Sequence, residues 1–151
     1  MKFQITTDYA IRILQHLHET RREGIQPAAT IAAAVGMTYP FFIKIANHLK
    51  QAGLIYSIQG RNGGYMIAKP GEEISFYDVF LATEDDTPVG HCHHSVRDDH
   101  RCTWSTIGDC PNRGFTCQMQ LLLIQEMKRH SIVDLPVAPR STHLQRVFFA
   151  K

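Results

Sequence analysis

The sequence of 151 residues predicts a mainly α-helical fold with a small β-wing, namely a winged helix-turn-helix followed by a long C-terminal helix. Two observations support this class. Segments with helical spacing and then two β-rich segments follow one another in the order helix, short helix, glycine turn, helix, hairpin. Helical spacing then resumes only late in the chain, after a long stretch without periodicity.

The first helix is predicted from its start signal and its apolar stripe. Thr6 or Thr7 suits the N-cap position, and the helix is expected to run to about Thr20. Its apolar positions recur at helical spacing along one face: Tyr9, Ala10, Ile13, Leu14 and Leu17.

The helix-turn-helix follows directly. Pro27 suits the first turn of a second helix over residues 28–35, and Gly36 can take the left-handed conformation that stops a helix. Thr38 then caps a third helix that extends to about residue 52. The apolar residues of this third helix fall on one face: Phe42, Ile45, Ala46 and Leu49.

A β-hairpin and a short helix complete the predicted DNA-binding half. After Gly53, the β-rich segments 54–58 and 65–68 flank a glycine-rich tip at residues 59–64. A short helix is expected to start at Ser75 and to include Leu81.

The rest of the chain divides into a loop, a helix and a tail. From residue 83 to about 116 the sequence is rich in Asp, His, Cys, Gly and Pro and predicts a long loop. Residues 117–131 regain helical spacing, with an apolar stripe too wide for one packing partner. The predicted units are a DNA-binding domain at 1–82, the cysteine loop and long helix at 83–135, and a loosely ordered tail at 136–151.

The distribution of charge indicates which half of the chain meets a polyanion. Residues 1–70 carry eight Lys and Arg against three acids, whereas residues 71–151 carry eight against eleven. A basic half joined to an acidic half favours double-stranded DNA as the partner of the first half. Many solvated surfaces carry as much charge, so the order of elements is the stronger argument.

Candidate DNA contacts lie on the third helix and on the wing. An α-helix fills the major groove and presents its first turns to base edges. Lys44 and Lys50 suit phosphate contacts, and Arg61 suits the DNA backbone or the minor groove. The candidate set is Thr38, Tyr39, Pro40, Phe41, Lys44, Lys50, Ser57, Gln59, Arg61 and Asn62.

Some of these candidates have a purely structural alternative. Tyr39, Phe41 and Phe42 are core residues in that interpretation, which is the favoured one for Phe42. Arg61 is then an ordinary turn charge. The glycines around Arg61 favour a DNA contact, because small residues let the wing tip approach the duplex.

All four cysteines fall in a window of 26 residues: Cys92, Cys102, Cys110 and Cys117. Nine, seven and six residues separate them, so no C-x-x-C pair of a zinc finger or thioredoxin is present. Four histidines share this loop: His91, His93, His94 and His100. Such ligands suit zinc or an iron–sulfur cluster about equally by spacing alone, and free reactive thiols are the remaining alternative.

Several classes of protein are not supported. No apolar run approaches the roughly 20 residues that span a bilayer. Residues 1–6 lack the hydrophobic region of a signal peptide, so a cytoplasmic protein is expected. The sequence has no phosphate-binding loop, nucleophile–base signature or cofactor fingerprint, so no enzyme is predicted.

Several segments together resemble a known family. They are Asp8-Tyr9-Ala10, Ile31-Ala32, and residues 49–55, 60–68, 74–80 and 131–135. They look like the IscR/NsrR family of bacterial winged-helix repressors, also called the Rrf-two family. The resemblance covers residues 1 to about 135, and the glycine-rich wing followed by Tyr65 is its most specific part.

The resemblance implies a homodimer on a palindromic operator, with the long C-terminal helix as the dimerisation helix. Many members bind an iron–sulfur cluster through three cysteines of the loop and a fourth ligand of another type. In some members that ligand is an acid at the start of the first helix of the partner subunit, and Asp8 stands at that place. An acid there is also favoured by the helix dipole alone.

This sequence departs from the family pattern in ways that leave the ligand set open. It has four loop cysteines at wide spacing, and Gln59 stands where relatives often carry an arginine. Either all four cysteines bind the cluster, or three bind with Asp8 or a loop histidine. Cys110 and Cys117 are the strongest candidates because they adjoin the predicted helix; Cys102 follows and Cys92 is last. A 2Fe-2S cluster is favoured over 4Fe-4S, with zinc as the alternative.

The resulting hypothesis is a sensor of redox state, nitric oxide or iron status. Oxidation, nitrosylation or loss of the cluster would change the packing of the loop, and so the spacing of the two recognition helices. Two alternatives are a regulator braced by structural zinc and a cluster-free regulator controlled by a thiol switch or a protein partner.

Overall fold

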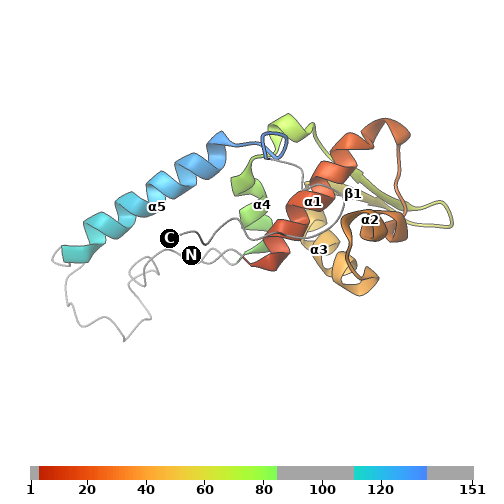
Figure 1. Ribbon diagram of the computed structural model, residues 1–151, viewed down its shortest axis with the longest axis horizontal. Helices are drawn as coiled ribbons and strands as arrows, with labels where there is room; N and C mark the ends of the chain where they lie inside the picture. The colour runs from red at the N-terminus through yellow and green to blue at the C-terminus, as the bar shows by residue number, and fades with distance from the viewer. Residues whose placement is uncertain (1–3, 85–110, 136–151) are drawn as a thin grey trace, which may run out of the picture.

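The structure is a computed structural model, and it describes residues 4–84 and 111–135 (Figure 1). The described part is mostly helical with one small antiparallel sheet, which confirms the predicted class. Its elements are α1 (Ile5–Glu19), η1 (Arg21–Glu23), α2 (Ala28–Val35), α3 (Tyr39–Gln51), β1 (Ile55–Ile58), β2 (Gly64–Ile67), η2 (Gly71–Glu73), α4 (Phe76–Thr83) and α5 (Pro111–Arg129).

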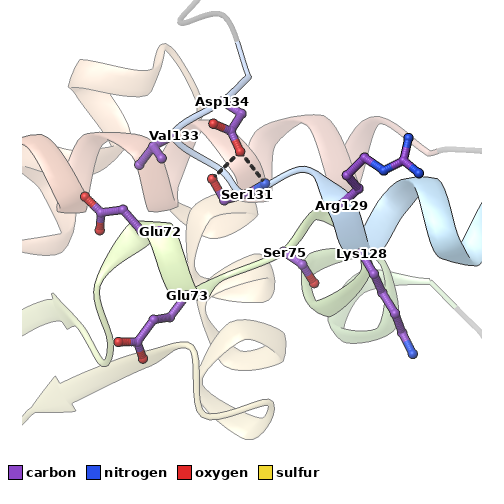
Figure 2. A pocket seen from close by; sticks show the side chains of 8 residues that line it. All are labelled: Glu72, Glu73, Ser75, Lys128, Arg129, Ser131, Val133 and Asp134. Carbon is purple, nitrogen blue, oxygen red and sulfur yellow. Dashed lines mark hydrogen bonds between the residues drawn. The ribbon is translucent and has the colours of Figure 1, made fainter.

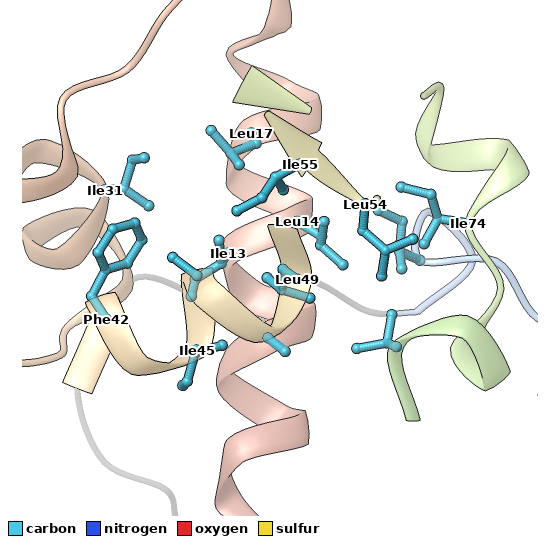
Figure 3. Packing of buried hydrophobic residues seen from close by; sticks show 14 of the residues in the cluster. Ile13, Leu14, Leu17, Ile31, Phe42, Ile45, Leu49, Leu54, Ile55 and Ile74 are labelled. Atoms are coloured by element: carbon cyan, nitrogen blue, oxygen red, sulfur yellow. The ribbon is translucent and has the colours of Figure 1, made fainter. Parts of the chain in front are cut away.

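Helix α1 is the centre of the core. It packs against α2, α3, α4 and β2, and its apolar stripe is buried as predicted apart from half-buried Tyr9. Figure 3 shows these side chains gathered with those of α3 and β1. The fully buried members of the core include Ile13, Leu14, Ile31, Phe42, Ile45, Leu49, Ile74 and Ile132.

The start of α1 differs from the prediction. Gln4 is the N-cap, the helix begins at Ile5, and neither Thr6 nor Thr7 caps it. The Thr7 side chain is buried instead, and its hydroxyl donates to the Glu84 carboxylate at the end of α4. Gln4 N donates to the same carboxylate at 2.8 Å. A threonine whose partner lies 77 residues away gives no local signal of that role.

The helix-turn-helix matches the prediction closely. Helices α2 and α3 meet at 105°, within the roughly 90–120° typical of this motif. Gly36 has φ 76° and ψ 41°, the left-handed conformation that ends α2. Met37 N then donates to Ala32 O at 2.9 Å, which closes the helix end.

The wing has a third strand-like partner. β1 pairs with β2 in antiparallel register, with Tyr56 opposite Met66. Gln26, in the linker before α2, forms a further antiparallel bridge with Tyr65, with N–O distances of 2.9 and 2.8 Å. The wing is therefore fastened to the body of the domain through the α1–α2 linker.

Helix α4 begins with a capping box. Asp78 N donates to Ser75 Oγ at 3.2 Å, and Ser75 N donates to the Asp78 carboxylate at 2.9 Å. These reciprocal bonds satisfy two donors that a helix start leaves free. The predicted start at Ser75 is thus the N-cap, and the helix runs to Thr83.

Helix α5 begins earlier than predicted, at Pro111 rather than at Cys117. The Asp, His, Cys, Gly and Pro content of residues 83–116 suggested a loop, whereas Pro is also favoured in the first turn of a helix. Figure 1 shows α5 projecting from the body, with only its Arg129 end near α4. The predicted loop ligands Cys92, Cys102 and Cys110, and the tail at 136–151, lie outside the described residues.

Within the described ranges, no single helix is long and apolar enough to cross a membrane. Helices α2 and α3 meet the length and composition test only as a pair, with the 105° bend between them.

Candidate DNA interface and metal centre

The start of α3 presents a group of exposed side chains. Thr38, Tyr39 and Pro40 are exposed, with Tyr39 54% accessible, and Lys44 is exposed one turn later. This is the part of a recognition helix that faces base edges when the helix enters the major groove. Lys50, at the other end of α3, is exposed as well.

The two phenylalanines that follow have different places. Phe42 is fully buried, as the structural alternative predicts. Phe41 is half-buried and meets the Tyr9 ring of α1 edge-on, with ring centroids 5.5 Å apart. Part of the Phe41 ring therefore packs within the domain, and the remainder is exposed.

Tyr65 adjoins this surface and was not among the residues that the sequence singled out for DNA contact. Its ring packs edge-on against Phe42 at 5.2 Å, which places the start of β2 against the recognition helix. Burial, and to a smaller extent the nearby Tyr39, raises the pKa of the Tyr65 hydroxyl. The Tyr65 hydroxyl therefore keeps its neutral form to a higher pH than an ordinary tyrosine. The only sequence signal for it was its place after the glycine pair.

The wing tip exposes Gln59, Arg61 and Asn62, while Ser57 on β1 is half-buried. Within the described part of the chain, no ion pair involves Arg61. This cation is accordingly available to a phosphate.

The glycines of the wing have a structural reason of their own. A Cβ on Gly63 would lie 2.2 Å from Ile58 O, and one on Gly64 would lie 2.2 Å from Gln26 O. Both contacts are with backbone oxygens, which cannot move aside cheaply. The expectation that these glycines serve the approach to DNA is not needed to explain them, so the case for Arg61 rests on its exposure and its position.

Asp8 lies in the first turn of α1, on the exposed side. Its carboxylate pairs with the Arg12 guanidinium at 2.8 Å, and this guanidinium lies 5.3 Å from the Tyr9 ring centroid. Asp8 also borders a cavity of about 360 Å³ between α1 and α4, lined by Gln4, Ile5, Thr7, Asp8, Ile11 and Phe76.

Helix α5 exposes large apolar side chains along its length. Phe115 is 67% accessible, Leu121 59% and Leu122 53%, whereas Met127 near the root of the helix is buried. Cys117 lies on the second turn of α5, and Cys110 directly precedes the helix. An apolar surface of this kind on a helix that projects into solvent marks an interaction site.

The described residues of one chain do not bring Asp8 near the start of α5. Figure 1 shows the Pro111 end of α5 far from α1, which carries Asp8. Among residues 4–84 and 111–135, no group of three or more His, Cys, Asp and Glu side chains is placed to hold a metal ion. If Asp8 and Cys117 share a metal centre, they come from different subunits.

The fold and the exposed face of α3 define a class, the winged-helix DNA-binding regulators. The chain belongs to the Rrf2 family, whose model, described as "Iron-dependent Transcriptional regulator", matches residues 3–137. It is therefore a transcriptional regulator of the IscR/NsrR type and not an enzyme, as the sequence predicted.

Individual relatives agree with this assignment. The chain is 27% identical over 135 residues to the HTH-type transcriptional regulator NsrR of Shouchella clausii, covering 89% of this chain and 88% of that protein. It is 35% identical over 92 residues to Protein aau3 of Rhizobium meliloti, covering 61% of this chain and 59% of that protein.

Two solved structures share the fold. T. potens IscR matches with a TM-score of 0.65 at 17% identity, covering 89% of this chain and 85% of that one. CymR of B. subtilis, named as its global cysteine regulator, has the same TM-score and identity, covering 89% of this chain and 95% of that one.

Proposed function

We propose that this regulator is a homodimer that binds a palindromic operator and senses redox state, nitric oxide or iron status through an iron–sulfur cluster. The observation that carries the proposal is the projecting helix α5, which exposes apolar side chains along its length and has cysteines at its free end.

The exposed apolar side chains of α5 support a dimer. Leu121, Leu122 and Phe115 expose more than half of their surfaces in a single chain. Burying apolar area stabilises by about 25 cal/mol per Å², so a solvated row of such residues favours pairing. Pairing two α5 helices about a two-fold axis would carry the free end of each helix toward the body of the other subunit.

That arrangement would let ligands from two chains converge. Cys110 and Cys117 flank the start of α5, and Asp8 is exposed on the body of the domain. Among the described residues of one chain, the ion partner of Asp8 is Arg12. An exposed pair of this type contributes about 0–1 kcal/mol, so releasing Asp8 to a metal costs little.

The donors present fit an iron–sulfur cluster. Thiolates are the usual ligands of such clusters, and the family description names iron. We favour a 2Fe-2S cluster held by Cys110, Cys117 and Cys102, with Asp8 or Cys92 completing the set. When bound, the cluster supplies one-electron chemistry and reactivity toward nitric oxide. The chain itself supplies the thiolates. The Asp8 carboxylate would connect α1 to the same metal centre.

DNA recognition falls to α3 and the wing. Thr38, Tyr39 and Pro40 face the base edges, and the exposed part of Phe41 can add an apolar contact. Lys44 and Lys50 neutralise phosphates, and Arg61 reaches the backbone or the minor groove, flanked by Gln59, Asn62 and Ser57. A shift of α1 would move Phe41 through its contact with Tyr9, which links the metal centre to the reading helix.

Paired carboxylate variants and one cysteine variant test the proposal. Cys110→Ala should lose the visible absorbance of anaerobically purified protein, and Asp8→Asn should change the spectrum and the operator affinity. Glu73→Gln is the matched control, because Glu73 is an exposed carboxylate on a different element, η2. Unchanged absorbance and DNA binding in Cys110→Ala would exclude that residue as a sensor ligand.

The alternative is a zinc-braced or cluster-free regulator controlled by a thiol switch or a protein partner. The fourth loop cysteine and the likeness in fold to a cysteine regulator favour it. Zinc is colourless, and a cluster-free protein keeps its operator binding after chelation, so metal analysis and a chelation test separate these forms from the cluster.

A further inference from the structure

A buried glutamine on α1 holds the segment that follows α5. Gln15 is only 6% exposed. Its side-chain amide donates to Ile132 O at 2.9 Å and to Leu135 O at 3.0 Å. Because an amide NH₂ has two N–H groups, this one side chain satisfies two carbonyls of the same segment.

The backbone of the same segment is fastened to the DNA-binding half. Phe76 N donates to His130 O at 2.8 Å, and Ile132 N donates to Ile74 O at 2.9 Å. The Ile132 side chain is fully buried in the core. The chain that leaves α5 is therefore anchored from two sides, by the start of α4 and by Gln15.

The contacts of residues 130–135 with Gln15 and with the start of α4, called the joint below, fix the position of α5 and do not form a ligand site. Figure 2 shows a turn closed by Asp134, whose carboxylate accepts from Ser131 N at 2.9 Å and from the Ser131 hydroxyl at 2.6 Å. The charged ends of Glu72 and Glu73 point away from that of Lys128, so the groove that they line has no converging polar groups.

A small rotation at the joint moves the free end of α5 by a large distance. At about 1.5 Å per residue, the 19 residues of α5 extend roughly 28 Å. A rotation of about 10° at the root would then move the free end by about 5 Å, more than the roughly 3.4 Å between successive bases of a strand. Small changes at the joint therefore decide how far apart the two recognition helices of a dimer lie.

We propose that Gln15 is the positioning residue that sets the angle between α5 and the DNA-reading half, and with it the half-site spacing that the dimer prefers. The proposal rests on the homodimer proposed above. Without the Gln15 amide, two carbonyls lose their donor and the exit segment is held by the backbone bridge alone.

Two substitutions of Gln15 and one control test the role on the full-length protein. Gln15→Glu keeps the shape but replaces the NH₂ group, and with it both N–H donors, by one oxygen, and Gln15→Met keeps the size without charge. Ile13→Val removes a buried methyl group from the same helix and leaves the Gln15 amide in place. The first measurement is amide hydrogen exchange of residues 130–135, which should be about tenfold faster in both Gln15 variants and unchanged in Ile13→Val.

The second measurement is the preferred half-site spacing. DNA duplexes that bind the wild type are first selected from a random pool. The number of base pairs between their half-sites is then changed one base pair at a time. The wild type should prefer one spacing by about tenfold, and the Gln15 variants by less than about threefold, with Ile13→Val like the wild type.

The outcomes separate the two proposals. Unchanged amide hydrogen exchange in the Gln15 variants would show that the Gln15 amide does not hold residues 130–135. Faster exchange together with the wild-type spacing preference would show that Gln15 does not set the spacing. If the wild type selects single half-sites, the proposed homodimer fails and the spacing role with it. The exchange result then still decides whether Gln15 holds the segment.

Discussion

Replacing Gly64 by alanine should detach the wing from the body of the domain. The new Cβ would lie 2.2 Å from Gln26 O and 2.7 Å from Gln26 C. Gln26 must then move, which breaks its two backbone hydrogen bonds with Tyr65. Gly64 has no left-handed φ, so the effect comes from the close approach and not from backbone strain.

The size of the effect follows from the interactions that the substitution breaks. Two backbone hydrogen bonds contribute about 1 kcal/mol each. The edge contact of Tyr65 with Phe42 adds about 0.5–1.5 kcal/mol if the ring is displaced. The free energy of unfolding should fall by about 2–4 kcal/mol, and operator affinity should fall as the wing shifts. Urea denaturation and fluorescence anisotropy with a labelled duplex measure the two effects.

A second glycine provides the control. Gly36→Ala meets nothing within 4 Å but has φ +76°, so it should cost only the left-handed strain of about 1–2 kcal/mol. A Gly64→Ala variant as stable as the wild type, or one no less stable than Gly36→Ala, would refute the reasoning about the wing.

Three further predictions follow from the described surfaces. Lys44→Ala and Arg61→Ala should each weaken operator binding and lower the slope of log affinity against log salt by about 1; an unchanged slope in anisotropy titrations argues against phosphate contact. Leu122→Glu should convert a dimer to monomers in sedimentation, and a persistent dimer would place the interface elsewhere. Hydrogen bonds from the side chain and backbone of Ser131 lower the pKa of Asp134 below 3.8. The ionised carboxylate therefore stabilises the fold above the ordinary aspartate pKa, and this contribution is lost as pH falls through the lowered pKa. Asp134→Asn should therefore make the Tm depend less on pH in the acid range. An identical dependence of Tm on pH in the wild type and the variant contradicts this.

Local signals were enough for the helix-turn-helix. The apolar spacing of α3 and the left-handed Gly36 depend on neighbours within one or two turns, so the sequence pattern predicts them. The start of α5 was predicted too late because residues up to 116 show no helical periodicity and are rich in loop-forming residue types.

Long-range partners account for most of what the sequence did not show. Thr7 has the local signal of an N-cap, but its hydroxyl donates to Glu84 at the far end of the DNA-binding half. Gln15 is a polar residue with no local signal of burial, but its amide donates to Ile132 O. The wing glycines suggested a close approach to DNA, whereas at Gly64 the nearby backbone of Gln26 already requires a glycine. Joint ligation by Asp8 and the loop cysteines remains a prediction, since three of those cysteines lie outside the described residues.

The most direct test of the central claim is one anaerobic purification, with a visible spectrum and assays of iron, acid-labile sulfide and zinc. A cluster-based sensor predicts coloured protein with iron and sulfide in equal amounts, and an operator affinity that changes when the cluster is removed. Colourless protein that holds zinc or no metal, with operator binding unaffected by chelation, would contradict it.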